Sequence, residues 1–271
     1  MAGLDNHVPY WGDVDAMHQF CEAKYVVSSY VAEFWNTWTN LPFFILPGLF
    51  MMYRGRGVFD LRMMICWASI VLIGIGSLMF HATMRFKWEM LDELPMLGLC
   101  LAGITAKDDT RWFTSGGWKL LVRAVSVSLT AGGLYLYLSG DNYPAFVHTF
   151  TLMVLMDAAL AFACTSCADK HGSWVARGLQ ISSLASIAVA RIFWEIEVAY
   201  CPAGSGGRLQ IFHVFWHMLA GLACYLGALR DVHVRYSALG VGVAVDTPGQ
   251  EMALVGLLGA SWRRPVTSKH D

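Results

Sequence analysis

Residues 62–84 read RMMICWASIVLIGIGSLMFHATM, an apolar run that carries a serine, Ser77, and a histidine, His81. A helix rises about 1.5 Å per residue, so this run is long enough to cross the roughly 30 Å hydrocarbon core of a bilayer. Polar side chains are costly at that depth and usually face the interior of a helix bundle. The run therefore predicts a membrane-spanning helix that carries two functional side chains, one turn apart on the same face.

Apolar runs of similar length recur along the chain. We predict an all-α integral membrane protein, a seven-transmembrane helix bundle, whose spans cover about 31–53, 62–84, 89–106, 119–138, 144–166, 174–197 and 208–229. Only 14% of the residues are charged, against about 25% in soluble domains. Residues 1–30 are then an N-terminal segment, 31–230 the catalytic bundle and 231–271 a poorly ordered tail. The net charge of -1 gives no reason to expect a nucleic-acid partner.

Lysines and arginines in the short loops predict the orientation, because they accumulate on the cytosolic side. One side carries Lys24, Arg85, Lys87 and Arg208. The other carries Arg54, Arg56, Arg62, Lys107, Arg111, Lys119, Lys170, Arg177, Arg230, Arg235, Arg263, Arg264 and Lys269. The richer side should be cytosolic. We therefore expect a lumenal or extracellular N terminus and a cytosolic tail.

Two cysteines, Cys21 and Cys201, lie outside the predicted spans on the lumenal side. Disulfides persist in such an oxidising environment. A bond between the two would tie the N-terminal segment to the loop before the last span, and the alternative is a pair of free thiols.

Three histidines are expected at one depth near the lumenal boundary. His81 lies near the outer end of its span, and His213 and His217, four residues apart, share a face of the last span. Asp92 begins the third span, just across a short turn from His81. Its neighbour Glu93 is expected to cap a helix start or to face water.

This set of side chains suits a catalytic zinc ion. Such an ion takes three protein ligands and leaves a fourth position for water, whose pKa it lowers. Asp92 would move a proton from that water to a leaving amine. Ser77 would donate a hydrogen bond to the developing oxyanion. The alternatives are histidines that only hydrogen-bond to neighbours and a serine that bonds back to its own helix.

The motifs in combination resemble those of the alkaline ceramidases, in the wider superfamily that includes the adiponectin receptors. The resemblance lies in Gly-x-Gly-Ser-x-x-Phe-His, Leu-Asp-Glu-Leu-Pro, Phe-His-x-x-Trp-His and the run from Ala32 to Thr37, and covers about residues 10–230. It implies an intramembrane amidase that hydrolyses ceramide to sphingosine and a fatty acid. By position, His81, His213 and His217 would hold zinc, Ser77 and Asp92 would be the catalytic pair, and Cys21 and Cys201 would form a disulfide. The predicted protein is a multi-pass protein of the endoplasmic reticulum or Golgi membrane.

The chain departs from the family pattern at a calcium site. That site resembles Asp-Trp-Cys-Glu-x-Asn together with a glutamate on the first span. Glu22 and Glu33 are kept here, but Gln19 and Lys24 replace two oxygen ligands. Calcium needs six to eight oxygen ligands, so we expect weak or absent calcium binding. Lys24 would then stand between Glu22 and Glu33 as an internal cation, unless Asp13 or Asp15 folds back to restore the site.

Other polar residues have no assigned catalytic role. Arg191 and Glu195 share a helix face and are expected to pair. The resemblance places Glu195 and Glu197 near the pocket, and Asp157 has no obvious partner. Two other classes of function remain open: a zinc-containing receptor of the adiponectin-receptor type, and a transporter in which the histidines relay protons.

Overall fold

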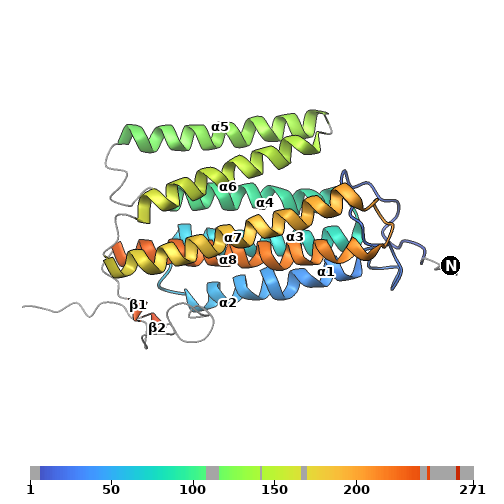
Figure 1. The fold of residues 1–271 in the computed structure, drawn as a ribbon, viewed down its shortest axis with the longest axis horizontal. Helices are drawn as coiled ribbons and strands as arrows, with labels where there is room; N and C mark the ends of the chain where they lie inside the picture. The colour runs from blue at the N-terminus through green and yellow to red at the C-terminus, as the bar shows by residue number, and fades with distance from the viewer. Residues whose placement is uncertain are drawn as a thin grey trace, which may run out of the picture.

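A computed structural model describes residues 7–107, 116–140, 142–165, 170–238, 243–244 and 261–262, and these are almost all helix and connecting loops. The helical elements lie side by side along one long axis (Figure 1). They are α1 (Phe34–Asn40), the π-helical η1 (Leu41–Ile45), α2 (Leu46–Arg54), α3 (Leu61–Thr83), α4 (Phe86–Ala106), α5 (Gly116–Gly140), α6 (Tyr143–Thr165), α7 (Lys170–Tyr200), the 3-10 turn η2 (Arg208–Gln210) and α8 (Ile211–Ala238). Two short strands, β1 (Val243–Ala244) and β2 (Ser261–Trp262), pair antiparallel.

Four of the described helices are long and apolar enough to cross a membrane. They are α3, α5, α6 and the segment Arg208–Arg235 that contains most of α8. The outermost helix in Figure 1, α5, leaves Leu120, Val127 and Leu136 exposed. A soluble protein seldom exposes such a face, whereas lipid would cover it. The protein is therefore a helical membrane protein.

The helix bounds differ from the predicted spans in several places. The predicted span 31–53 is three successive helical pieces, since Pro42 and Pro47 fall in the first turns of η1 and α2 and lack the N–H that would continue a regular helix. The helix predicted from residue 89 begins at Phe86. Asp92 and Glu93 consequently lie inside α4 rather than at its start. Most of the predicted tail 231–271 lies outside the described residues, although α8 continues to Ala238.

Helices α3 and α4 meet at a glycine. A Cβ added at Gly76 would lie 2.2 Å from the carbonyl oxygen of Leu91 and 2.5 Å from the backbone nitrogen of Asp92. That carbonyl has no intrahelical donor, because the residue four positions on is Pro95. Gly76 thus lets the two backbones approach closely and places Asp92 opposite the turn of α3 that carries Ser77.

We expect Gly76→Ala to separate α3 from α4. Overpacking of this kind costs about 1–3 kcal/mol, and a displacement of about 1 Å at a catalytic group can lower the rate about 100-fold. Melting temperature in detergent would measure the first effect, and the activity of the purified protein the second. Gly98→Ala, on α4 but with nothing within 4 Å of the added Cβ, is the matched control. Equal behaviour of the two variants would contradict the role given to Gly76.

Candidate metal centre and active site

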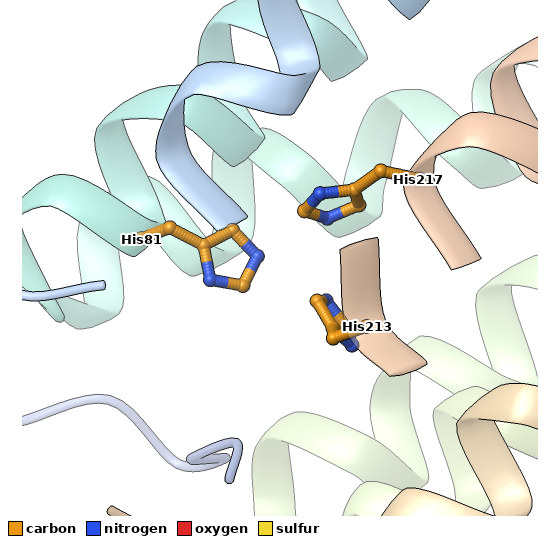
Figure 2. Close-up of side chains that lie close together, drawn as sticks. All are labelled: His81, His213 and His217. Atoms are coloured by element: carbon orange, nitrogen blue, oxygen red, sulfur yellow. The ribbon is translucent and has the colours of Figure 1, made fainter. Parts of the chain in front are cut away.

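Three buried histidines converge at one end of the bundle. His81 comes from α3, and His213 and His217 come from successive turns of α8. One ring nitrogen from each lies within 4.8 Å of the others. Figure 2 shows the three rings gathered around a common point. The structure therefore brings together the histidines that the sequence analysis selected, and their spacing would allow them to bind one metal ion.

A polar group lies near Nδ1 of each imidazole. His81 Nδ1 lies 2.5 Å from a carboxylate oxygen of Glu33, and His217 Nδ1 lies 2.8 Å from the Thr39 hydroxyl. His213 Nδ1 lies 3.4 Å from a carboxylate oxygen of Glu197, without a completed hydrogen bond between the two atoms. Partners of this kind fix the ring of a metal-binding histidine and leave the other nitrogen to the metal. Because Nε2 of each ring remains for the common point, the donor set fits a metal such as zinc.

The sequence analysis missed Thr39 and did not foresee these roles of Glu33 and Glu197. Thr39 lies six residues after Glu33 on the first helical segment. No spacing rule links it to a histidine almost 180 residues away. A polar residue on an apolar helix was the only available signal.

Ser77 and Asp92 lie beside the histidines. The Ser77 hydroxyl is 3.4 Å from Nε2 of His217 and also interacts with the carboxyl group of Asp92. Both residues and His217 line a cavity of about 150 Å³. This main cavity has mostly apolar walls, to which Ile73, Leu99 and Ala220 contribute. The predicted catalytic pair is thus located where a water molecule and an apolar ligand could meet the histidines.

The N-terminal segment covers the outer side of the cluster. The ring of Phe20 lies with its centroid 3.7 Å from that of His213. His18 stacks on Tyr143 at 4.2 Å, and burial lowers the pKa of its imidazole to about 4. The predicted disulfide between Cys21 and Cys201 is confirmed. The backbone N–H of Cys21 also donates to the carboxylate of Glu197 at 2.9 Å. Because the disulfide fixes Cys21, this hydrogen bond holds in place the carboxylate that faces His213.

Removal of the disulfide should lower stability. A cross-link over a long loop typically contributes about 2–4 kcal/mol, so we expect Cys21→Ser with Cys201→Ser to lower the melting temperature. Reductant should lower the melting temperature of the wild type and leave that of the double variant unchanged. The other cysteines of the chain are present in both proteins. A reductant effect in the double variant would assign the stability to another cause.

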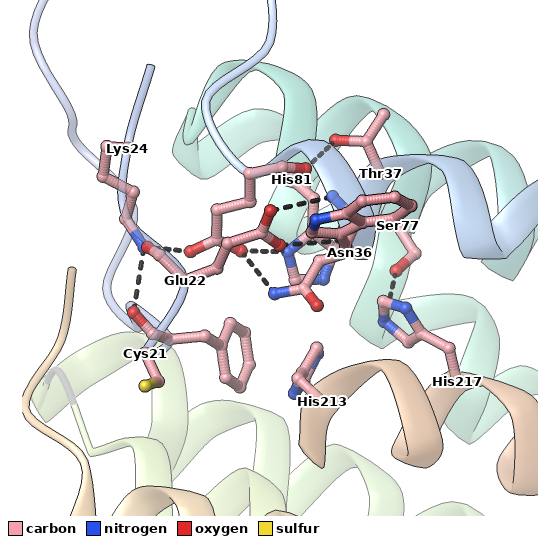
Figure 3. Close-up of polar contacts among 12 residues, drawn as sticks. Cys21, Glu22, Lys24, Asn36, Thr37, Ser77, His81, His213 and His217 are labelled. Carbon is pink, nitrogen blue, oxygen red and sulfur yellow. Dashed lines mark hydrogen bonds and ion pairs between the residues drawn. The ribbon is translucent and has the colours of Figure 1, made fainter. Parts of the chain in front are cut away.

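Lys24 occupies the place where the family pattern has a calcium ligand. Its Nζ pairs with Glu33, and it donates to the backbone carbonyl oxygens of Phe20 at 2.9 Å and Glu22 at 3.1 Å. Figure 3 shows Lys24 and His81 within one network of polar contacts. The other Glu33 oxygen accepts from Asn36 at 3.0 Å and contacts His81. One carboxylate therefore connects an internal cation to the candidate metal centre.

The Glu22 carboxylate does not face the lysine, contrary to the sequence expectation. It accepts the backbone N–H groups of Trp35 and Asn36, at 2.8 and 2.9 Å, and so satisfies the first turn of α1. Burial raises the pKa of this carboxyl group to about 7, although the two N–H donors oppose the rise.

The alternative in which an aspartate restores the calcium site is not seen. Asp15 accepts from the backbone N–H of Phe86 at 2.6 Å and pairs with Arg85 at 2.7 Å. The backbone carbonyl oxygen of Asp13 accepts from Arg85. This part of the N-terminal segment is therefore attached to the start of α4.

The structure places the remaining polar residues that the sequence analysis singled out. Arg191 pairs with Glu195, as expected. Asp157, which had no obvious partner in the sequence, lies 2.6 Å from Lys107, which also lies 3.0 Å from Asp231. Glu93 neither caps a helix start nor faces water. It is buried inside α4, only 5% exposed.

Comparison with known proteins agrees with this arrangement. The family model described as Ceramidase matches residues 12–240. Alkaline ceramidase 3 of Mus musculus is 28% identical over 249 residues, which cover 87% of this chain and 90% of the mouse protein. An alkaline ceramidase of Drosophila melanogaster is 29% identical, covering 76% of this chain and 72% of the fly protein. One of Caenorhabditis elegans is 28% identical, covering 79% and 80%. With a family model that spans most of its length and all the histidines of the cluster, this chain belongs to the ceramidase family.

Proposed function

We propose that this protein is a zinc-dependent amidase that hydrolyses the N-acyl bond of ceramide within the membrane, giving sphingosine and a free fatty acid. The observation that supports this most is the buried three-histidine cluster, which opens beside Ser77 and Asp92 onto an apolar cavity. Membership of the ceramidase family indicates the substrate class.

His81, His213 and His217 would hold the zinc ion. Zinc with three protein ligands and one open position lowers the pKa of a water molecule and polarises a carbonyl group. The Nδ1 partners Glu33, Glu197 and Thr39 keep the rings oriented. Such partners typically change metal affinity or activity by about 10- to 100-fold.

Asp92 and Ser77 would carry out the proton and oxyanion steps. The attacking water forms a bond to the amide carbon, and Asp92 takes its proton. The C–N bond then breaks, and Asp92 gives the proton to the leaving nitrogen. With His217 holding the metal, the Ser77 hydroxyl would be available to donate a hydrogen bond to the amide oxygen as negative charge develops there.

The main cavity would hold the acyl chain. Along α8 its lining residues extend from His217 to Asp231. At about 1.5 Å per residue, these two residues are about 21 Å apart along the helix. Its apolar walls favour a hydrocarbon chain, because burying apolar surface is favourable. Ceramide would enter sideways from the bilayer with its amide beside Asp92.

We further propose that the seven helical segments all cross the bilayer, with the N terminus lumenal. The loop charges support this orientation. The disulfide also joins the N-terminal segment to the loop that follows α7, and disulfides persist in oxidising compartments. In Figure 1 that segment and that loop lie at the same end of the bundle. The endoplasmic reticulum or Golgi membrane is the proposed location. Reaction of engineered single cysteines with an impermeant reagent in intact and opened vesicles would test the orientation.

The function is tested by release of sphingosine from a labelled ceramide by purified, zinc-loaded protein. Asp92→Asn should retain its metal but lose about 10²- to 10⁴-fold in rate, the range for a general acid–base group. Asp13→Asn changes an exposed carboxylate and should leave the rate unchanged. No release by folded, zinc-loaded wild type would overturn the proposal and favour a receptor or transporter role.

A further inference from the structure

A second, smaller cavity adjoins the candidate active site on its outer side. It has a volume of about 40 Å³, and its lining includes Asp92, Glu93, Tyr143, Arg191 and His213. Asp92, Met96, Phe150 and Trp216 line the main cavity as well. A ligand whose scissile bond lies at Asp92 can therefore occupy both cavities at once. Unlike the largely apolar main cavity, the outer cavity offers several polar side chains.

Glu93 is a polar group in this cavity that has no use in the mechanism. It is 5% exposed, and its Oε2 atom accepts no hydrogen bond from any described residue. Tyr137 is close enough to interact with the carboxyl group, but the Tyr137 hydroxyl also lacks a completed hydrogen bond in the described chain. Buried polar groups are nearly always hydrogen-bonded, since leaving one unmade is costly. Because Glu93 Oε2 has no hydrogen-bond donor among the described residues and lies beside the bond to be cleaved, the geometry points to a ligand that supplies such a donor.

Ceramide has donors at the required place. Its amide nitrogen is on the second carbon of the sphingoid base, and hydroxyl groups are on the first and third carbons. With the amide at Asp92 and the acyl chain in the main cavity, these hydroxyl groups fall toward the outer cavity. We propose that the outer cavity is a subsite for the sphingoid head and that Glu93 accepts a hydrogen bond from one of its hydroxyl groups. This inference rests on the proposed ceramide hydrolysis.

A subsite of this kind makes the enzyme select for the hydroxyl group. A site built to bond a substrate hydroxyl strongly rejects the analogue that lacks it, because the protein group is then left without a partner. We expect kcat/KM for at least one of 1-deoxyceramide and 3-deoxyceramide to be about 100-fold or more below that for ceramide.

The test measures wild type, Glu93→Met and Glu89→Gln on ceramide and both deoxyceramides, with zinc content and melting temperature. Methionine is close to glutamate in size and needs no hydrogen bond. Glu93→Met should therefore keep or raise the melting temperature. It should lower kcat/KM for ceramide at least about 10-fold and leave kcat/KM for the rejected deoxyceramide almost unchanged. The variant would then no longer discriminate between the two substrates. Glu89 is a buried carboxylate on the same helix whose two oxygens accept the N–H groups of Met17 and His18, at 2.7 and 2.8 Å. Glu89→Gln should lower the melting temperature and should lower the activity by the same factor on every substrate.

The outcomes separate the two proposals. Wild type that hydrolyses ceramide and both deoxyceramides equally well overturns the subsite and leaves ceramide hydrolysis standing. An equal loss on all three substrates in Glu93→Met, with a lower melting temperature, also overturns it, since a merely structural carboxylate behaves that way. Wild type that is inactive on ceramide overturns the proposed function, and the subsite with it.

Discussion

His213→Ala should reduce ceramide hydrolysis by at least about 10³-fold and leave the purified protein without stoichiometric zinc. A Lewis acid contributes several kcal/mol to stabilising developing charge, and each 1.4 kcal/mol corresponds to a factor of ten in rate. His213 comes from the same helix as His217 and one turn before it, so its loss leaves two ligands and an incomplete site. Metal analysis of the protein, beside sphingosine release, measures both effects.

The matched control is His148→Ala, since His148 is an exposed histidine on α6 and should change neither quantity. Thr39→Val tests the support of the ligands. It removes the hydroxyl that contacts Nδ1 of His217, and we expect a loss of about 10- to 100-fold. Zinc-free His213→Ala with wild-type activity would contradict the metal centre altogether. Equal losses in Thr39→Val and His213→Ala would mean that orientation, rather than ligation, accounts for the effect.

The residues of the reaction centre could be selected from the sequence because helical spacing and membrane depth constrain them. His213 and His217 are four residues apart, so they must share a face, and a histidine at membrane depth is costly enough to indicate a function. The lumenal position of Cys21 and Cys201 suggested their pairing and the family resemblance supported it, and the structure contains the disulfide. These arguments require only the local helix and its approximate ends.

Partners across helices could not be predicted in the same way. Whether Thr39 contacts His217, or Lys107 contacts Asp157, depends on the rotation and offset of helices that are far apart in sequence. Glu93 was misjudged for a related reason. Its α4 begins three residues earlier than predicted, at Phe86, and this moves Glu93 from the helix start into the bundle. Helix ends are the least certain part of such predictions, and a shift of one turn exchanges exposure for burial.

Lys24→Met should destabilise the protein by about 3–5 kcal/mol, the usual effect of removing one partner of a buried ion pair. Glu33 is fully buried and would keep its charge beside His81 without the ammonium group. Since Glu33 also holds Nδ1 of His81, zinc affinity should fall together with stability. Thermal melting and zinc titration would measure the two effects. An unchanged melting temperature would show that Lys24 contributes little, as most exposed ion pairs do.

The same lysine should make the enzyme independent of calcium. Its single charge already faces the carboxylate and the two backbone carbonyl oxygens that surround it, and an ammonium group provides no oxygen ligand for a further cation. We expect a calcium-selective chelator, with zinc kept saturating, to leave wild-type activity unchanged. Lys24→Asn replaces the ammonium group with an amide whose oxygen can coordinate a cation, as in the family pattern. It also leaves Glu33 free to bind that cation. Added calcium should therefore restore part of the stability lost in Lys24→Asn and none of that lost in Lys24→Met, because methionine offers no oxygen. Calcium-dependent activity in the wild type would show that the cation binds despite Lys24, and the lysine would then have to move away from Glu33.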